Sequence, residues 1–153
     1  MNTFSKGMIS GFIATVVLSL LMLAKSMMGL MPNLDVVTML AGMAHQFMYT
    51  PATPAVGWML HFLIGTVLWG SLFALLLPAL PGSRTWVKGL SFGILAWLIM
   101  MIVVMPMAGA GLFGMRLSLM APVATLMLHL VYGGVMGWSY DRLGETRGNV
   151  LAH

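Results

Sequence analysis

The sequence has 153 residues, of which 60% are hydrophobic and 7% are charged, whereas soluble domains carry about 25% charged residues. So few charges cannot cover a surface exposed to water, and the composition therefore predicts an integral membrane protein. The chain contains no cysteine, which excludes disulfides, thiolate metal sites and cysteine nucleophiles. Its seven Lys and Arg residues form no basic cluster, so nucleic acid is not an expected partner.

Four apolar segments are long enough to cross a bilayer, which takes about 20 residues per helix. They are residues 7–28, 56–77, 88–108 and 119–139. Backbone polar groups in lipid must be satisfied within their own segment, and the weak alternating pattern of β-barrel strands is absent. We therefore expect an all-α bundle of four transmembrane helices. Most positive charges fall on one side of it, which predicts cytoplasmic N- and C-termini in a bacterial inner membrane.

A shorter amphipathic segment, about residues 35–49, lies between the first two spans. Asp35 stands where it can cap the N-terminus of a helix. Two stripes follow helical spacing, a polar one of Thr38, Gly42, His45 and Tyr49 and an apolar one of Val36, Leu40, Met43 and Phe47. This pattern predicts an interfacial helix on the periplasmic side, with a solvated His45.

The sequence also repeats itself. "PAVGWMLHFLIG" from Pro54 and "PVATLMLHLVYG" from Pro122 share the pattern P-x4-M-L-H-x3-G, which aligns His61 with His129. "KGMISGFIA" from Lys6 similarly matches "KGLSFGILA" from Lys88. We interpret these matches as two tandem parallel hairpins within a single membrane domain, residues 1–153. Repeat one covers residues 6–77 and includes the interfacial helix, repeat two covers 88–140, and a short cytoplasmic tail covers 141–153.

Parallel repeats place equivalent residues at equal depth, so His61 and His129 should share one level in the outer half of the bilayer. Glycines one helical turn away, Gly65 and Gly133, mark the face of each helix that packs in the bundle interior. Both imidazoles are therefore predicted to point inward.

Two inward histidines suggest three interpretations. The first is a bis-histidine site for one haem b, in which Gly65 and Gly133 leave room for the macrocycle and Lys25 or Arg116 meets its propionates. The second is a copper site, because the chain has 18 methionines and thioether with imidazole suits Cu(I). The third is that the histidines only fasten the bundle by hydrogen bonds, in a cofactor-free structural or accessory subunit.

The copper hypothesis needs ligands from another helix. Met59 and Met127 precede the histidines by two residues, which puts them about 200° apart on the helix and prevents chelation. Met101 or Met105 would have to complete a site with His61 and His129.

Catalysis by the chain itself is not expected. The spans contain no Asp or Glu, and the sequence has no HExxH, P-loop or GxGxxG motif. Pro106 should end or kink the third helix, before a glycine-rich connection. The expected partners are the lipid bilayer and either another membrane protein or a second copy of the chain.

The segments "KGMISGFIATVVLS", "GWMLHFLIGTVLWG" and "VVMPMAGAGLFG" give the chain a family resemblance. It resembles an uncharacterised family of short bacterial four-helix inner-membrane proteins, a domain of unknown function. The resemblance implies a small inner-membrane protein and assigns no catalytic residue.

Overall fold

The computed structural model describes the backbone of residues 2–150 and the side chains of residues 2–144. All regular structure in this part of the chain is helical. Four stretches are long and apolar enough to cross a membrane, which confirms the predicted number of spans. They are Thr3–Met27, Pro54–Leu76, Thr85–Met107 and Ala121–Gly144.

The first span is the single helix α1 (Thr3–Met27), and the last lies within α7 (Ala121–Val150), which continues beyond the apolar residues. The two middle spans each contain a π-helical segment, in which the turn holds one extra residue. The second span is built of α3 (Pro54–Leu63), η1 (Ile64–Trp69) and α4 (Gly70–Leu76). The third is built of α5 (Thr85–Ile99), η2 (Met100–Val104) and α6 (Met105–Met107). The third span thus ends one residue after Pro106, as its position predicts.

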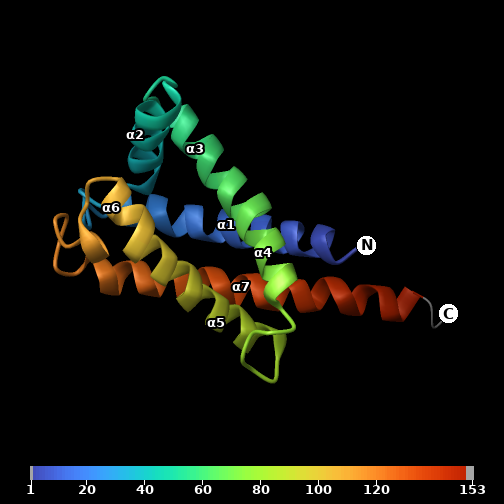
Figure 1. Cartoon of the computed structure of the whole chain (residues 1–153). Helices are drawn as coiled ribbons and strands as arrows, with labels where there is room; N and C mark the ends of the chain where they lie inside the picture. The colour runs from blue at the N-terminus through green and yellow to red at the C-terminus, as the bar shows by residue number, and fades with distance from the viewer. Residues whose placement is uncertain (1, 151–153) are drawn as a thin grey trace.

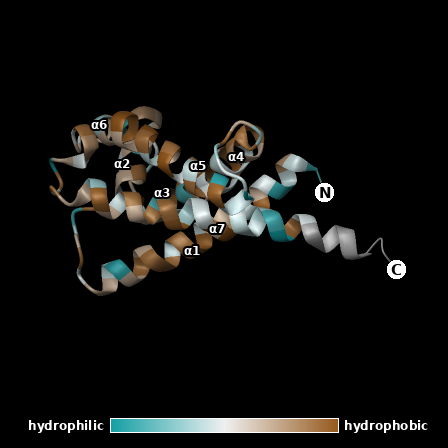
Figure 2. Cartoon of the chain, turned by 90° about the horizontal axis from the view of Figure 1, so that it is seen from below, coloured by the Kyte–Doolittle hydropathy of each residue, from teal (hydrophilic) through white to brown (hydrophobic). Residues whose placement is uncertain are grey.

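The spans form two closely packed pairs that meet along α1 and α7. Figure 1 shows α1 and α7 running beside each other in opposite directions, with α5 along α7 and α3–α4 leaning across α1. The start of α1 and the end of α7 lie at the same end of the bundle in both views (Figures 1 and 2). Hydrophobic residues occupy most of the length of the spanning helices (Figure 2). The bundle therefore offers an apolar exterior that suits lipid.

Glycines set the closest helix contacts. A Cβ added at Gly89 on α5 would lie 2.1 Å from the carbonyl oxygen of Gly133 on α7. A Cβ at Gly7 on α1 would lie 2.3 Å from the carbonyl oxygen of Gly70 on α4. At such distances only a hydrogen fits between the backbones, so these pairs hold the hairpins together by close approach.

The two hairpins differ in register. The sequence repeat aligns Gly7 with Gly89 and Gly65 with Gly133. Gly89 meets Gly133, yet Gly7 meets Gly70, which lies five residues beyond Gly65 and follows the π-helical segment η1. The extra residue of η1 rotates the helix that follows it. The face that α4 presents to α1 therefore differs from the face that the corresponding part of α7 presents to α5.

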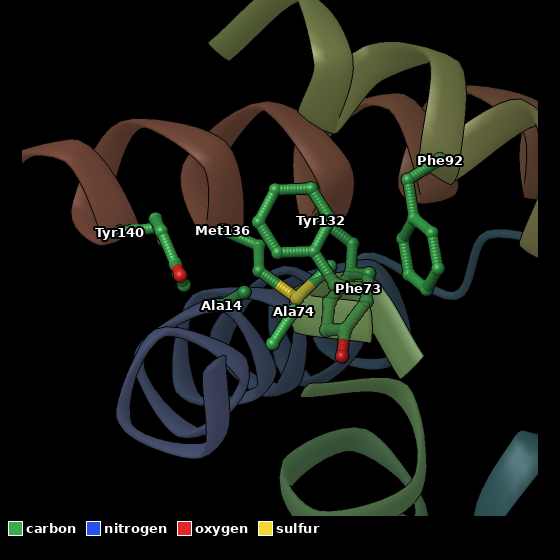
Figure 3. Packing of buried hydrophobic residues seen from close by; sticks show 7 residues of the cluster. All are labelled: Ala14, Phe73, Ala74, Phe92, Tyr132, Met136 and Tyr140. Atoms are coloured by element: carbon green, nitrogen blue, oxygen red, sulfur yellow. The ribbon is translucent and has the colours of Figure 1, made fainter. Parts of the chain in front are cut away.

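Aromatic and thioether side chains fill the half of the bundle nearer the termini. Seven buried residues from α1, α4, α5 and α7 form this cluster (Figure 3): Ala14, Phe73, Ala74, Phe92, Tyr132, Met136 and Tyr140. The Phe73 ring lies 5.3 Å from Phe92 and 5.6 Å from Tyr140, measured between ring centres, both in edge-to-face geometry. These contacts tie α4 to α5 and α7 and close the bundle at this level.

The predicted amphipathic segment is the helix α2 (Val36–Met48). Asp35 caps it, since its carboxylate accepts hydrogen bonds from the N–H groups of Val37 and Thr38 at 3.0 and 3.1 Å. The expected polar stripe is exposed.

The buried face of α2 is Val37, Ala41 and Ala44, whereas Phe47 of the expected apolar stripe is exposed. These small residues, and not the larger apolar ones, form the buried face because α2 packs close against α3. A Cβ at Gly57 would lie 2.1 Å from the Val37 carbonyl oxygen.

The close glycine contacts predict a specific cost. Gly89→Ala should destabilise the bundle by about 1–3 kcal/mol, the usual cost of overpacking, because its new methyl group meets backbone that cannot yield. Gly42→Ala is the matched control, since Gly42 is a helical glycine on α2 with no atom within 4 Å of its built Cβ. Thermal unfolding in detergent measures both. An unfolding midpoint for Gly89→Ala at or above that of Gly42→Ala would contradict the contact.

Candidate functional site

A cavity of about 620 Å³ lies between the helices in the half of the bundle away from the termini. It is lined by residues of α1, α2, α3, α5, α7 and both π-helical segments. His61, His129, Gly65 and Lys25 are all among its lining residues. The structure therefore brings four of the predicted site residues to one space.

His61 is buried, and its tautomer follows from its neighbours. Its Nε2 lies 3.1 Å from the Ser19 hydroxyl oxygen on α1. The single Ser19 hydroxyl hydrogen is donated to the Thr15 carbonyl, at 2.7 Å. We therefore assign the His61 proton to Nε2, the tautomer in which Ser19 donates to Thr15 and accepts from His61, and this leaves a lone pair on Nδ1.

His129 is half-buried on α7 and carries the opposite tautomer. Its Nδ1 lies 2.8 Å from the Thr125 carbonyl oxygen, one turn earlier on the same helix. A carbonyl can only accept, so Nδ1 carries the hydrogen and Nε2 keeps a lone pair.

Each histidine is therefore oriented by one bond to the protein and retains one basic nitrogen. The fully buried side-chain N and O atoms without a hydrogen-bond partner, among the described residues, belong to Thr50 and Thr66. The free nitrogens of His61 and His129 are thus accessible rather than sealed in the packing. A neutral imidazole whose other N–H is held by the protein is the form that binds metals or accepts hydrogen bonds.

One hydrogen bond relates the depths of the two histidines. The Tyr132 hydroxyl on α7 donates to the Gly65 carbonyl oxygen on η1, at 2.6 Å. Tyr132 follows His129 by three residues and Gly65 follows His61 by four, in helices that run the same way. Each histidine thus lies about one helical turn, roughly 5 Å, from the same link.

Aromatic rings stand around His61. Its ring centre lies 5.7 Å from the Trp58 ring and 5.7 Å from the Phe62 ring, both edge-on. Trp58, Trp69 and Tyr132 also line the cavity. Flat apolar walls with a few polar atoms are typical of small-ligand sites.

The end of the cavity farthest from the termini is polar. Lys25 Nζ donates to the carbonyl oxygens of Met31 and Leu34, which holds the connection to α2 against the end of α1. An ammonium group has three donors, so one remains. Burial by itself raises the pKa of Asp35, but hydrogen bonds from Thr38 and Val37 and the nearby Lys25 outweigh it and hold that pKa below its ordinary value. Asp35 is therefore ionised at neutral pH.

The other four predicted site residues lie outside the cavity lining. Gly133 packs against Gly89, and Arg116 packs along Gly111 in the connection after α6. Met101 and Met105 are fully buried in a second apolar cluster with Leu34 and Ala110.

The sulfur of the fully buried Met101 lies 3.8 Å from the hydroxyl of Thr125, which lines the cavity. Thr125 is one turn before His129. Within residues 2–144, no group of three or more His, Asp or Glu side chains is gathered around a common point.

Sequence reasoning missed Ser19 and Tyr132, the residues that orient and link the histidine helices. A signal for Ser19 was present, because Gly7, Gly11, Thr15 and Ser19 follow each other at steps of four and are all buried on one face of α1. Such a small and polar stripe marks the side of α1 that contacts other helices.

The chain matches a known protein family. The model of a family of unknown function, DUF6789, matches residues 1–150. No curated protein and no solved structure matches the chain.

The hydrogen bonds predict different tautomers for the two histidines. Nitrogen-15 NMR of the protein in detergent should find Nε2–H on His61 and Nδ1–H on His129. Ser19→Ala should remove the tautomer preference of His61 and leave His129 unchanged, because only His61 contacts Ser19. A His61 ring that keeps its tautomer in Ser19→Ala would show that Ser19 does not orient it.

Proposed function

The chain belongs to DUF6789, a family of unknown function, and we propose that it is a non-enzymatic membrane protein that binds a small ligand between His61 and His129. The observation that carries this proposal is that two imidazoles, each with one ring nitrogen held by the protein and one free, line the same cavity. A volume of about 620 Å³ lies within the usual range of roughly 300–1,000 Å³ for ligand sites.

Haem b is the ligand class that we place first. When bound, it would supply an iron that imidazole nitrogens can hold and that transfers single electrons. His129 offers Nε2 for such a bond, with its other N–H on a backbone carbonyl, the usual support of a metal-bound histidine. His61 offers Nδ1 while Ser19 holds Nε2, and it would offer Nε2 only if that hydrogen bond were released.

The surroundings support a flat amphiphilic ligand. Leu18, Trp58, Ile64 and Leu128 give the cavity apolar walls. The remaining N–H of Lys25 suits a carboxylate at the polar end, as a haem propionate would need.

Copper is a second candidate through different methionines from those predicted. Met22 and Met100 line the cavity, so their thioethers are available beside the histidines. Catalysis by the chain remains outside the proposal, because Asp35 is the one carboxylate in the lining and it is committed to capping α2.

A visible spectrum and metal analysis of the purified protein test this function. We expect a low-spin haem spectrum, as isolated or after titration with haem, that His129→Ala abolishes and His61→Ala weakens or abolishes. His45→Ala is the matched control, since His45 is exposed on α2 and its Nδ1 bonds the Thr50 carbonyl, away from the cavity. A colourless, metal-free protein that takes up neither haem nor copper would refute the proposal.

We further propose that the chain is a tandem repeat in a bacterial inner membrane, with cytoplasmic termini and α2 at the periplasmic surface. The excess of Lys and Arg at the termini and in the α4–α5 connection supports this orientation. The aligned histidines and their common link through Tyr132 and Gly65 support the repeat.

The absence of cysteine makes the orientation directly measurable. In intact cells freed of the outer membrane, an impermeant thiol reagent should label Gln46→Cys on α2 and spare Ser83→Cys in the α4–α5 connection. Both positions are exposed. The reverse labelling would place the termini outside.

A further inference from the structure

The cavity has one packed end, and its flank is open. The aromatic cluster around Phe73 and Phe92 (Figure 3) adjoins it on the side of the termini, because Tyr132 belongs to the cluster and also lines the cavity. Trp69 adds to this packing, with its ring centre 5.9 Å from that of Phe92. Beyond this ring contact, α3–η1 and the end of α5 with η2 both line the cavity and form no extensive interface with each other.

The two walls carry side chains that touch the cavity and the outside at once. Leu68 on η1 lines the cavity and is 56% exposed, and Ile99 at the end of α5 lines it and is 36% exposed. Both positions lie well inside their spans, at the depth of hydrocarbon. A residue that is both lining and exposed marks an opening, which we call the seam between η1 and η2.

The polar end of the cavity is also open. Ser26, Asp35 and Thr38 line it and are exposed, beside Lys25 with its remaining donor. Charged and hydroxyl groups therefore meet the cavity at the membrane surface, and leucine and isoleucine meet it at depth. This is the order of a lipid molecule in one leaflet, a polar head above an apolar chain.

We propose that the seam is a lateral port and that the cavity exchanges its contents with the bilayer, so that a phospholipid acyl chain occupies it when no other ligand is bound. The head of that lipid lies at the Lys25–Asp35 end. A molecule entering sideways keeps its head in the polar layer and its chain in hydrocarbon throughout, which avoids the cost of carrying either part through the wrong medium. The proposal rests on the proposed function in one respect, since a ligand that binds at the histidines must be a lipid-soluble amphiphile if it enters by this port.

The π-helical segments are consistent with such a port. Both lie on the seam, η1 with Ile64, Gly65 and Leu68 and η2 with Met100 and Val104 in the lining. A π turn is wider than an α turn and its hydrogen bonds skip one residue more, so these are the parts of the two spans whose backbone most readily changes register.

A photoreactive lipid tests the port. The full chain is placed in vesicles that contain phosphatidylcholine with a diazirine in the middle of one acyl chain. After illumination, mass spectrometry should find adducts on Tyr132, which lines the cavity and is 4% exposed, so that surrounding lipid cannot reach it from outside. Met136, one turn further along α7 and fully buried in the core, should carry none.

Narrowing the seam should remove the Tyr132 adducts. Leu68→Trp and Ile99→Trp put a larger ring in the opening, whereas Val67→Trp and Leu98→Trp make the same change at neighbouring exposed positions outside the lining. We expect labelling of Tyr132 to fall to the level of Met136 in the first pair and to stay at the wild-type level in the second. The unfolding midpoint of each variant reports whether it is folded.

Absence of Tyr132 adducts in the wild-type protein would overturn the proposal, as would unchanged labelling in both seam variants. The readout uses a lipid and not a histidine ligand. A failure of the haem titration would therefore not affect it, and His45→Ala, on the exposed face of α2, should leave the labelling unchanged.

Discussion

Backbone contact at glycine is the constraint on which the rest of this bundle depends. Lipid gives no hydrophobic reason for helices to associate, so they adhere where their surfaces come closest. In this chain the approach occurs between α5 and α7 at Gly89, Gly93 and Gly133, and between α1 and the η1–α4 part of the second span at Gly7 and Gly11. The first part of that span, α3, makes its close glycine contact with α2 at Gly57 instead, and the cavity lies between α1, α3 and α7.

The polar side chains in that space follow from the same medium. A hydroxyl or imidazole in hydrocarbon must find a partner close by, and α1 and α7 supply it from their own backbone. Three hydroxyl groups donate to the carbonyl four residues earlier, those of Thr15, Ser19 and Thr125. His129 likewise donates its Nδ1–H to the carbonyl four residues earlier. Satisfying these donors locally has a chemical result, because it fixes which nitrogen of each histidine remains basic.

The sequence predicted the parts of this structure that depend on composition and spacing along one helix. The four spans, the cap of α2 at Asp35 and the end of the third helix after Pro106 are examples, and each rests on a local rule. The common cavity of His61 and His129 could be predicted in outline because the two histidines stand in similar sequence segments, which suggested a common depth. The parts that were not predicted depend on the tilt of one helix against another.

Helix tilt explains which candidate residues meet and which do not. Met101 and Met105 share a span with cavity residues, yet the rotation of η2 turns them toward Leu34 and Ala110. Gly65 packs against Thr15 of α1 and Gly133 packs against Gly89 of α5, so both face the first helix of their hairpin, yet only Gly65 also lines the cavity. No pattern within a single segment contains that information.

The π-helical segment η1 gives the two hairpins different mechanical properties. On α7, the residue aligned with Trp69 is Gly137, whose added Cβ would lie 2.5 Å from the Thr85 carbonyl oxygen, so α5 and α7 are joined by backbone. On the other side, Trp69 joins η1 to α5 through the edge of a ring, a contact that can slide or rotate at small energy. At this depth the contact between η1 and α5, made by side chains, can therefore yield more easily than the backbone contact between α5 and α7.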